Sequence, residues 1–174
     1  MRIFDFLCSH TLSGIDGYAI IRGEQKITWQ DLARQVRALQ AALGKDYKKG
    51  DRILLVTDDP LWQIIGLLGA SAAGLASILT DSSMPTSQKE SIFRSESIQG
   101  VVDPRNIPEN PLSDYPESST PWASGVAESD LFLGALSSGS TGTPKIIWRD
   151  HQSWTRAFPV QRKFFKWDRR THYS

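Results

Sequence analysis

The residues best suited to chemistry form one run of nine, rich in glycine and hydroxyl side chains and closed by a lysine. The run consists of Ser137, Ser138, Gly139, Ser140, Thr141, Gly142, Thr143, Pro144 and Lys145. Glycines let backbone N–H groups converge on a ligand, because no Cβ stands in the way. The hydroxyl groups add donors and the lysine adds a positive charge, which together suit the oxygens of a polyphosphate. We therefore predict a phosphate-binding loop over residues 137–145.

The spacing of this loop differs from that of the Walker A motif. In that motif the lysine follows a glycine directly and enters a helix, whereas here Thr143 and Pro144 separate Gly142 from Lys145. A strand-like pair of isoleucines follows the lysine. A kinase or another NTPase is therefore disfavoured, and a flexible polar linker of the same composition stays an alternative.

Other residues with chemical potential form weaker patterns. Four aspartates follow predicted strands, where acids either hold a metal ion or cap the next helix: Asp58, Asp59, Asp81 and Asp103. The three histidines have no metal-ligand spacing with one another or with Cys8, and we expect His151 in the first turn of a helix. No Gly-x-Ser-x-Gly is present, which excludes a serine nucleophile elbow.

Length and composition predict one soluble globular domain. The chain has 174 residues, of which 40% are hydrophobic and 22% are charged. The longest apolar region, residues 64–79, is interrupted by glycines and is too short to cross a membrane, so we expect no membrane span. Cys8 is the single cysteine, which rules out an internal disulfide and makes a cytoplasmic location the default.

Positive charge gathers near the end of the sequence. Residues 145–174 contain eight lysines and arginines against two aspartates, and tryptophans and phenylalanines are interleaved with them. Such a pattern fits a stacking surface for nucleic acid or an amphipathic helix whose aromatic residues face a core. We favour the helix and expect no nucleic-acid partner, because the pI is near 7.9 and no nucleic-acid motif accompanies the patch.

The elements that must position the loop alternate between helices and apolar strands. Strands are predicted at 18–22, 26–27, 52–57, 75–80, 100–103, 131–136 and 146–147, and helices at 2–12, 28–44, 59–74 and 85–95 and after Asp150. The central strands are apolar without alternation, which favours burial on both faces of a parallel sheet. The predicted fold class is α/β: a partly parallel sheet with helices on its faces. A proline-rich, acidic connection over 103–129 links its two parts.

Local signals set the expected helix boundaries. Thr28 is placed as a helix N-cap with Asp31 three residues later, and Gly44 is expected to end that helix. Asp58 or Asp59 is expected to cap the next helix. In that helix Gly66, Gly69 and other small residues permit close approach to a neighbouring element. Near the end of the chain, Pro159 is expected to kink a helix that buries Trp154, Phe158 and Phe164 or Phe165.

The run Ser-Gly-Ser-Thr-Gly-Thr-Pro-Lys over 138–145 is similar to the phosphate-loop signature of the ANL superfamily of adenylate-forming enzymes, which includes acyl-CoA synthetases, peptide-synthetase adenylation domains and luciferases. Residues 27–32 resemble the family's Thr-Tyr-x-Glu-Leu element, and residues 50–53 resemble its Gly-Asp-x-Val turn. Residues 66–84 occupy the place of its helix and Ala-Gly strand segment. The order of these segments resembles the N-terminal part of the family's large domain, incomplete at 174 residues.

Two positions depart from the family pattern. Ser137 stands where threonine is usual, which keeps the hydroxyl group. Ile146 stands where glycine commonly follows the lysine, and its β-branched side chain stiffens the exit of the loop. Residues 145–154, with Arg149, His151 and Trp154, look closest to bacterial acyl-CoA synthetases of the fatty-acid type.

The resemblance implies ATP-dependent activation of a small carboxylate to an acyl-adenylate, followed by thioester formation with coenzyme A. It assigns the ATP phosphates to residues 137–143 and Lys145, whereas the magnesium ligand and the other motifs of the family are expected outside this chain. The 174 residues are then expected to be inactive alone. The alternatives are a non-catalytic binding or assembly fragment, one part of a split enzyme that self-associates or joins a partner chain through exposed apolar surface, and an adenylation enzyme whose acceptor is a carrier protein.

Overall fold

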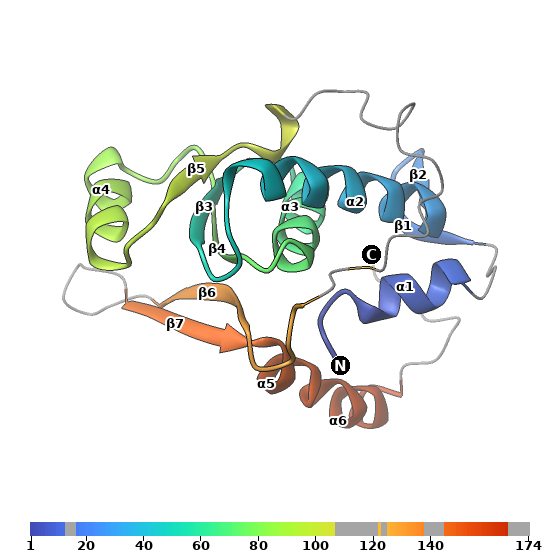
Figure 1. Ribbon diagram of the computed structural model, residues 1–174. Helices are drawn as coiled ribbons and strands as arrows, with labels where there is room; N and C mark the ends of the chain where they lie inside the picture. Colours follow the sequence, from blue (N-terminus) through green and yellow to red (C-terminus); the bar gives the residue numbers. More distant parts are fainter. Residues whose placement is uncertain (13–16, 107–121, 123–124, 138–144, 167–174) are drawn as a thin grey trace.

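The computed structural model describes residues 1–12, 17–106, 122, 125–137 and 145–166. Its elements follow one another in the order shown by the colours of Figure 1. They are α1 (Asp5–Leu12), β1 (Tyr18–Arg22), β2 (Gln25–Thr28), α2 (Trp29–Asp46), β3 (Arg52–Val56), α3 (Pro60–Ala72), β4 (Ala76–Thr80), α4 (Thr86–Ser95), β5 (Gly100–Val102), a 3-10 turn (Pro104–Asn106), β6 (Leu131–Ser137), β7 (Lys145–Asp150), α5 (His151–Thr155) and α6 (Ala157–Phe164).

The described strands form a hairpin and a larger sheet. Strands β1 and β2 pair antiparallel. The larger sheet has the order β5-β3-β4-β6-β7. Its first four strands in this order run parallel, and β7 returns antiparallel to β6. The predicted α/β fold with a partly parallel sheet is therefore confirmed.

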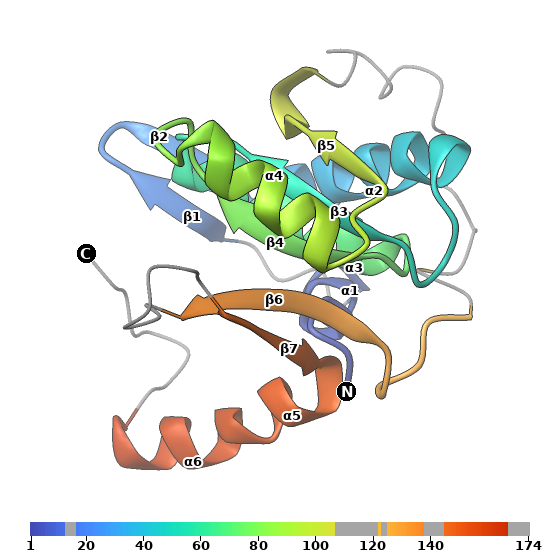
Figure 2. The ribbon, with the colours of Figure 1, turned by 90° about the vertical axis from the view of Figure 1, so that its left-hand side faces the viewer.

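Helices cover both faces of the sheet, and Figure 2 shows α4 on one face with α2 and α3 beyond the other. Side chains alternate between faces along a strand, so the neighbours of β3 separate into two cores. Ile53 and Leu55 join the large core with α1, α2 and α3. Leu54 joins the small core, which contains Ile78 and Ile92 and is covered by α4. Burial on both faces explains why β3 lacks polar alternation.

Side-chain caps begin the helices where the sequence predicts them. Thr28 Oγ1 accepts a hydrogen bond from the Asp31 backbone N–H at 3.0 Å at the start of α2. Asp59, rather than Asp58, caps α3 by accepting from the Leu61 N–H at 2.9 Å. Each cap satisfies a backbone donor that the first turn of a helix leaves without a partner.

The predicted end of α2 at Gly44 is wrong. The helix continues to Asp46, and the Tyr47 N–H donates to the Leu43 carbonyl at 3.0 Å. Gly44 keeps a helical backbone, whereas Gly50 has φ of +91° and makes the turn into β3. A glycine ends a helix when it takes up the left-handed conformation, and here Gly50 supplies it after the helix has ended.

The end of the described chain differs in part from the prediction. The helix after Asp150 is divided at Arg156 into α5 and α6, three residues before Pro159, because the proline ring crowds the carbonyl four residues earlier. Phe158 packs against the large core. Trp154 is 41% exposed, Phe164 is 77% exposed and no residue of α6 is buried, so the expected burial of Trp154 and of Phe164 or Phe165 is wrong. In α4, Ile92 is buried, whereas Phe93 is 39% exposed.

Helices α2 and α3 pack closely across Gly69. A Cβ atom added at Gly69 would lie 2.7 Å from Leu39 Cγ and 2.9 Å from Leu39 Cβ, which is closer than carbon atoms approach. Leu39 is itself 2% exposed and has no room to move away. The small residues of α3 therefore permit the close approach that the sequence predicts.

We expect Gly69→Ala to lower the free energy of unfolding by about 1–3 kcal/mol, because the added methyl group overpacks the contact with Leu39. Gly44→Ala is the matched control, since a Cβ at Gly44 meets nothing within 4 Å. It should raise stability by about 0.5–1 kcal/mol, as alanine is the better helix former. Urea unfolding of both variants measures the two effects, and equal effects of the two substitutions would contradict this packing.

Candidate phosphate-binding site

The predicted loop is closed by the β6–β7 hairpin. Ser137 and Lys145 are paired in its register, and the Ser137 hydroxyl donates to the Lys145 carbonyl at 3.1 Å. The structure thus brings the first and last of the predicted site residues together, with Lys145 exposed. The remaining predicted site residues lie outside the described part of the chain: Ser138, Gly139, Ser140, Thr141, Gly142 and Thr143.

The hairpin ends at the edge of the sheet where the parallel strands finish. The carboxyl ends of β3, β4, β5 and β6 share one edge, because these strands run in the same direction. Strand β6 ends at Ser137. The first residues after β3, β4 and β5 are Thr57, Asp81 and Asp103, respectively. Ligands of open α/β sheets bind at this edge. The topology therefore places the start of the predicted phosphate loop where such sheets bind their ligands.

Two of the edge aspartates hold the loops in place. Asp58 accepts a hydrogen bond from the Ser82 N–H at 2.8 Å and so ties the loop after β3 to the loop after β4. This backbone donor lowers the pKa of Asp58 below its ordinary value. Asp59 caps α3 and also pairs with Arg22 of β1 at 2.8 Å. Asp59 thus acts as a helix cap, as that alternative predicts, whereas Asp58 links two loops at the edge of the sheet.

Asp103 is paired with Arg105, whose guanidinium lies 2.6 Å from the carboxylate and lowers the pKa of Asp103.

Within the described ranges, no three histidine, cysteine, aspartate or glutamate side chains are grouped so that they could hold a metal ion. Across the same ranges, no helix has the length and apolar character that crossing a membrane requires.

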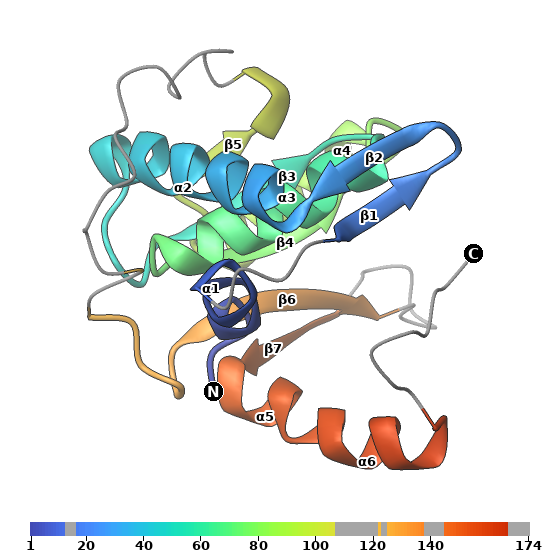
Figure 3. The ribbon, with the colours of Figure 1, turned by 90° about the vertical axis from the view of Figure 1, so that its right-hand side faces the viewer.

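His151 joins the end of β7 to the first residues of the chain, which Figure 3 shows beside α5. It is 1% exposed and stacks on Phe132 at 4.8 Å between ring centroids. Its Nδ1 accepts a hydrogen bond from the Ile3 N–H at 3.2 Å, so Nδ1 carries no proton and the imidazole is neutral. Burial lowers the pKa of His151 to about 4. The prediction that His151 is a first-turn helix residue is confirmed.

Sequence reasoning missed a cluster on the α4 face of the sheet. Trp148 of β7 donates from its indole nitrogen to Glu96 at 2.8 Å. Arg52 lies over the Trp148 ring at 4.5 Å from the centroid. These residues are far apart in the sequence and match no motif, so only the register of the sheet could have brought them together.

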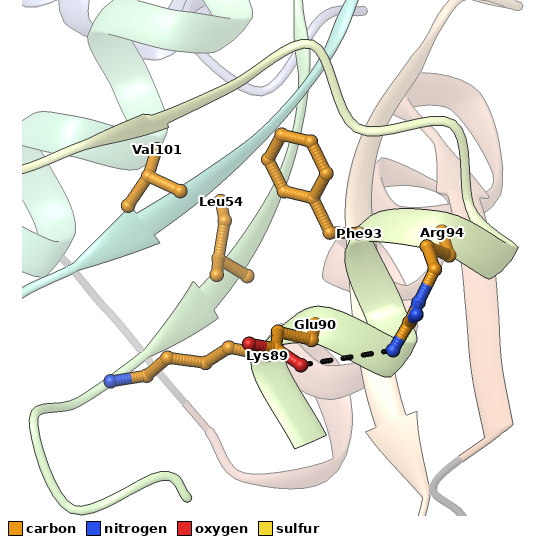
Figure 4. A pocket seen from close by; sticks show the side chains of 6 residues that line it. All are labelled: Leu54, Lys89, Glu90, Phe93, Arg94 and Val101. Atoms are coloured by element: carbon orange, nitrogen blue, oxygen red, sulfur yellow. Dashed lines mark ion pairs between the residues drawn. The ribbon is translucent and has the colours of Figure 1, made fainter. Parts of the chain in front are cut away.

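A shallow groove of about 530 Å³ lies between α4 and β5 on the same face (Figure 4). Leu54, Phe93 and Val101 form its apolar side. The charged side chains of Lys89, Glu90 and Arg94 line the rest, with Glu90 and Arg94 paired at 3.7 Å.

We expect the protonation of His151 to destabilise the fold in acid. Between pH 6.5 and about pH 4 the unfolded chain binds a proton at His151 that the folded chain does not. As the pH is lowered from 6.5 to about 4, the free energy of unfolding should therefore fall by about 1.4 kcal/mol per pH unit. Above pH 6.5 this contribution is constant.

His151→Asn keeps an acceptor for the Ile3 N–H but cannot be protonated, so this variant should lose that part of the slope. Urea unfolding at pH 4.5, 5.5, 6.5 and 7.5 measures it in both proteins. Carboxylates with a lowered pKa lose their contribution mostly below pH 4, outside the window. Equal slopes for the two proteins between pH 4.5 and 6.5 would contradict a buried neutral His151.

Comparison with known proteins agrees with this geometry. The model of the AMP-binding enzyme family matches residues 13–171, and the chain belongs to this family. An anguibactin system regulator from Vibrio anguillarum is 30% identical over 146 residues, which are 77% of this chain and 14% of that protein. The nonribosomal peptide synthetase lenA from Aspergillus lentulus is 25% identical over 126 residues, which are 69% of this chain and 3% of that protein.

Solved structures share the fold. VinN in complex with L-aspartate matches with a TM-score of 0.80 at 20% identity, over 96% of this chain and 48% of VinN. A fatty acyl-adenylate ligase from L. pneumophila matches with a TM-score of 0.77 at 18% identity, over 96% of this chain and 33% of the ligase. The fold is that of the N-terminal part of the large domain of adenylate-forming enzymes. The chain spans about half of VinN and a small part of the curated relatives that it matches.

Proposed function

We propose that this chain forms the phosphate-binding part of an enzyme that activates a carboxylate with ATP. In this reaction a carboxylate oxygen attacks the α-phosphorus of ATP, the bond to the bridging oxygen breaks, and pyrophosphate leaves as the acyl-adenylate forms. The observation that most supports the proposal is the hairpin, which holds Ser137 and Lys145 together at the carboxyl edge of the parallel sheet. Membership of the AMP-binding family supports the same chemistry.

The residues of the loop take complementary roles in the proposal. Backbone N–H groups and hydroxyls of residues 138–142 bind the β- and γ-phosphates. Lys145 neutralises charge that moves onto the pyrophosphate as it leaves. Such stabilisation of phosphate oxygens lowers the barrier to phosphoryl and nucleotidyl transfer. Enzymes of this family use ATP with Mg²⁺, and we place the magnesium ligand outside the residues described here.

The relatives suggest two classes of carboxylic acid as the substrate: fatty acids and amino acids. VinN has been solved with L-aspartate and with 3-methylaspartate, and the ligase from L. pneumophila with an acyl adenylate and pyrophosphate. Residues 145–154 resemble the fatty-acid type, which would transfer the acyl group to coenzyme A. The match to nonribosomal peptide synthetases favours an amino acid and a carrier-protein thiol as the second candidate.

A non-catalytic role as one part of a larger assembly is supported by a different observation. Val160 is 68% exposed and Phe164 is 77% exposed on α6, and Ile147 is 48% exposed on β7. Val160 and Phe164 are four residues apart and lie on one face of α6. A large apolar face exposed in this way is typical of a surface that another polypeptide covers. In this alternative the 174 residues bind a partner and release no pyrophosphate themselves.

We expect Lys145→Ala to weaken the binding of Mg·ATP by about tenfold to a hundredfold, because a charge-assisted contact to phosphate is lost. Lys163→Ala on α6 is the control, since it removes an equal charge from another exposed site. Isothermal titration of both variants measures the difference. Equal affinities for the two variants would remove Lys145 from the site.

Carboxylate-dependent release of pyrophosphate from Mg·ATP tests the proposed reaction itself. The panel contains fatty acids, aromatic acids and amino acids, and each is assayed with the wild-type chain and with Lys145→Ala. Release that depends on one class of acid and is lost in Lys145→Ala supports adenylation and identifies the substrate class. A folded chain that binds Mg·ATP but releases no pyrophosphate agrees with a phosphate-binding part that is inactive alone. A folded chain that binds no Mg·ATP would overturn the phosphate site and favour the assembly role.

A further inference from the structure

Trp148 connects the edge strand β7 to two residues from much earlier in the chain. Its indole Nε1–H donates to Glu96 Oε2 at 2.8 Å, just beyond the end of α4. The guanidinium carbon of Arg52, at the start of β3, lies 4.5 Å from the centroid of the Trp148 ring. Arg52 also lies 3.4 Å from the same Glu96 oxygen. The three side chains thus contact one another pairwise, and we call them the Trp148 cluster.

A glycine in β6 makes room for this arrangement. Gly134 is the partner of Trp148 in the β6–β7 register. A Cβ at Gly134 would lie 3.1 Å from the Trp148 ring, 2.9 Å from Ile146 and 2.8 Å from Ile78. Side chains from β7 and β4 therefore meet over Gly134, which lets the indole extend across β6 toward Arg52 and Glu96.

The position of β7 depends on such side-chain contacts. Among the described strands, β7 is hydrogen-bonded to β6 alone, at the edge of the sheet. A strand paired on one side frays and slips more readily than a central strand. The Trp148 cluster adds a link from β7 to α4 and β3, across the width of the sheet. Lys145 is the first residue of the same strand, three residues before Trp148.

We propose that the Trp148 cluster holds β7 in register and thereby positions Lys145 for the phosphates of a bound nucleotide. This role toward a nucleotide rests on the proposed function. Arg52, Glu96 and Trp148 are positioning residues, because they lie on the α4 face and act through the strand. Glu96 is 21% and Arg52 is 34% exposed at the side chain, so their ion pair is only partly screened by water.

Two conservative substitutions weaken the cluster and keep an aromatic ring or a hydrogen-bond acceptor in place. Trp148→Phe deletes the indole N–H and keeps an aromatic ring, and Glu96→Gln deletes the charge and keeps an acceptor. The matched control is Glu90→Gln on the same helix, which breaks the exposed Glu90–Arg94 pair seen in Figure 4. Circular dichroism and thermal unfolding establish that each variant is folded at the temperature of the measurements.

Hydrogen exchange of the nucleotide-free chain tests the hold on β7. We expect the backbone amides of residues 146–148 to exchange about fivefold to tenfold faster in Trp148→Phe and Glu96→Gln, since each loses one net hydrogen bond or charge contact. In these two variants the backbone amides of β3 and β4 should exchange at the wild-type rate. In Glu90→Gln all backbone amides should exchange at the wild-type rate. Unchanged exchange of β7 in both cluster variants would overturn the inference, whatever the nucleotide does.

Titration with Mg·ATP and with AMP tests the link to Lys145. AMP lacks the β- and γ-phosphates, so a misplaced Lys145 should weaken the binding of Mg·ATP about fivefold or more and leave AMP unchanged. An equal loss for both ligands, or no loss, would overturn the positioning role. If the wild-type chain binds no Mg·ATP, the proposed function fails and the positioning role fails with it, while hydrogen exchange still decides whether the cluster holds β7.

Discussion

The candidate site depends on one constraint: β6 is hydrogen-bonded to β4 on one side and to β7 on the other, and these two neighbours run in opposite directions. Its parallel pairing with β4 carries its carboxyl end to the ligand-binding edge of the sheet. Its antiparallel pairing with β7 returns the chain at once, so that Ser137 and Lys145 face each other in register. Between them the chain carries glycines and hydroxyl groups. A change in either pairing would move the loop away from the edge or separate its basic end from its start.

The packing around β6 explains why this arrangement holds. One face of the sheet is covered by α2 and α3, which approach each other across Gly69, and the other is covered by α4. The second face accepts Trp148 because Gly134 has no side chain. At the far end of β7, the buried and neutral His151 stacks on Phe132 and receives the Ile3 N–H. The hairpin is therefore fixed to elements that precede it in the sequence at the middle of β7 and at the far end of this strand.

Much of the fold could be predicted from the sequence, because the parallel strands are mainly apolar runs and helices α2, α3 and α5 begin at capping residues. Thr28, Asp59 and Asp150 cap their helices as expected, and the parallel strands follow from their lack of alternation. Gly44 misled the prediction, because a glycine ends a helix only when the chain turns there. The exposure of Phe164 shows that amphipathic spacing indicates an apolar face and does not say what covers it.

The site was predicted less completely than the fold. The motif indicated the loop, and in the structure Ser137 and Lys145 are paired where the loop begins and ends. The phosphate-binding roles of residues 137–143 and Lys145 stay predictions. The Trp148 cluster has no signal in the sequence, because Arg52, Glu96 and Trp148 meet only through the pairing of four strands, β3, β4, β6 and β7, and the packing of α4. Binding residues brought together by one loop are visible in a sequence, whereas residues that support them from other elements are not.

The most direct test of this account is a residue-resolved NMR titration of the chain with Mg·pyrophosphate. The account predicts that the amide signals that shift most are those of Ser137, Lys145 and the loop between them, with smaller shifts after β3 and β4 at the same edge. Shifts centred on another surface, such as the groove beside α4, or no shifts at millimolar pyrophosphate would contradict a phosphate site at this hairpin.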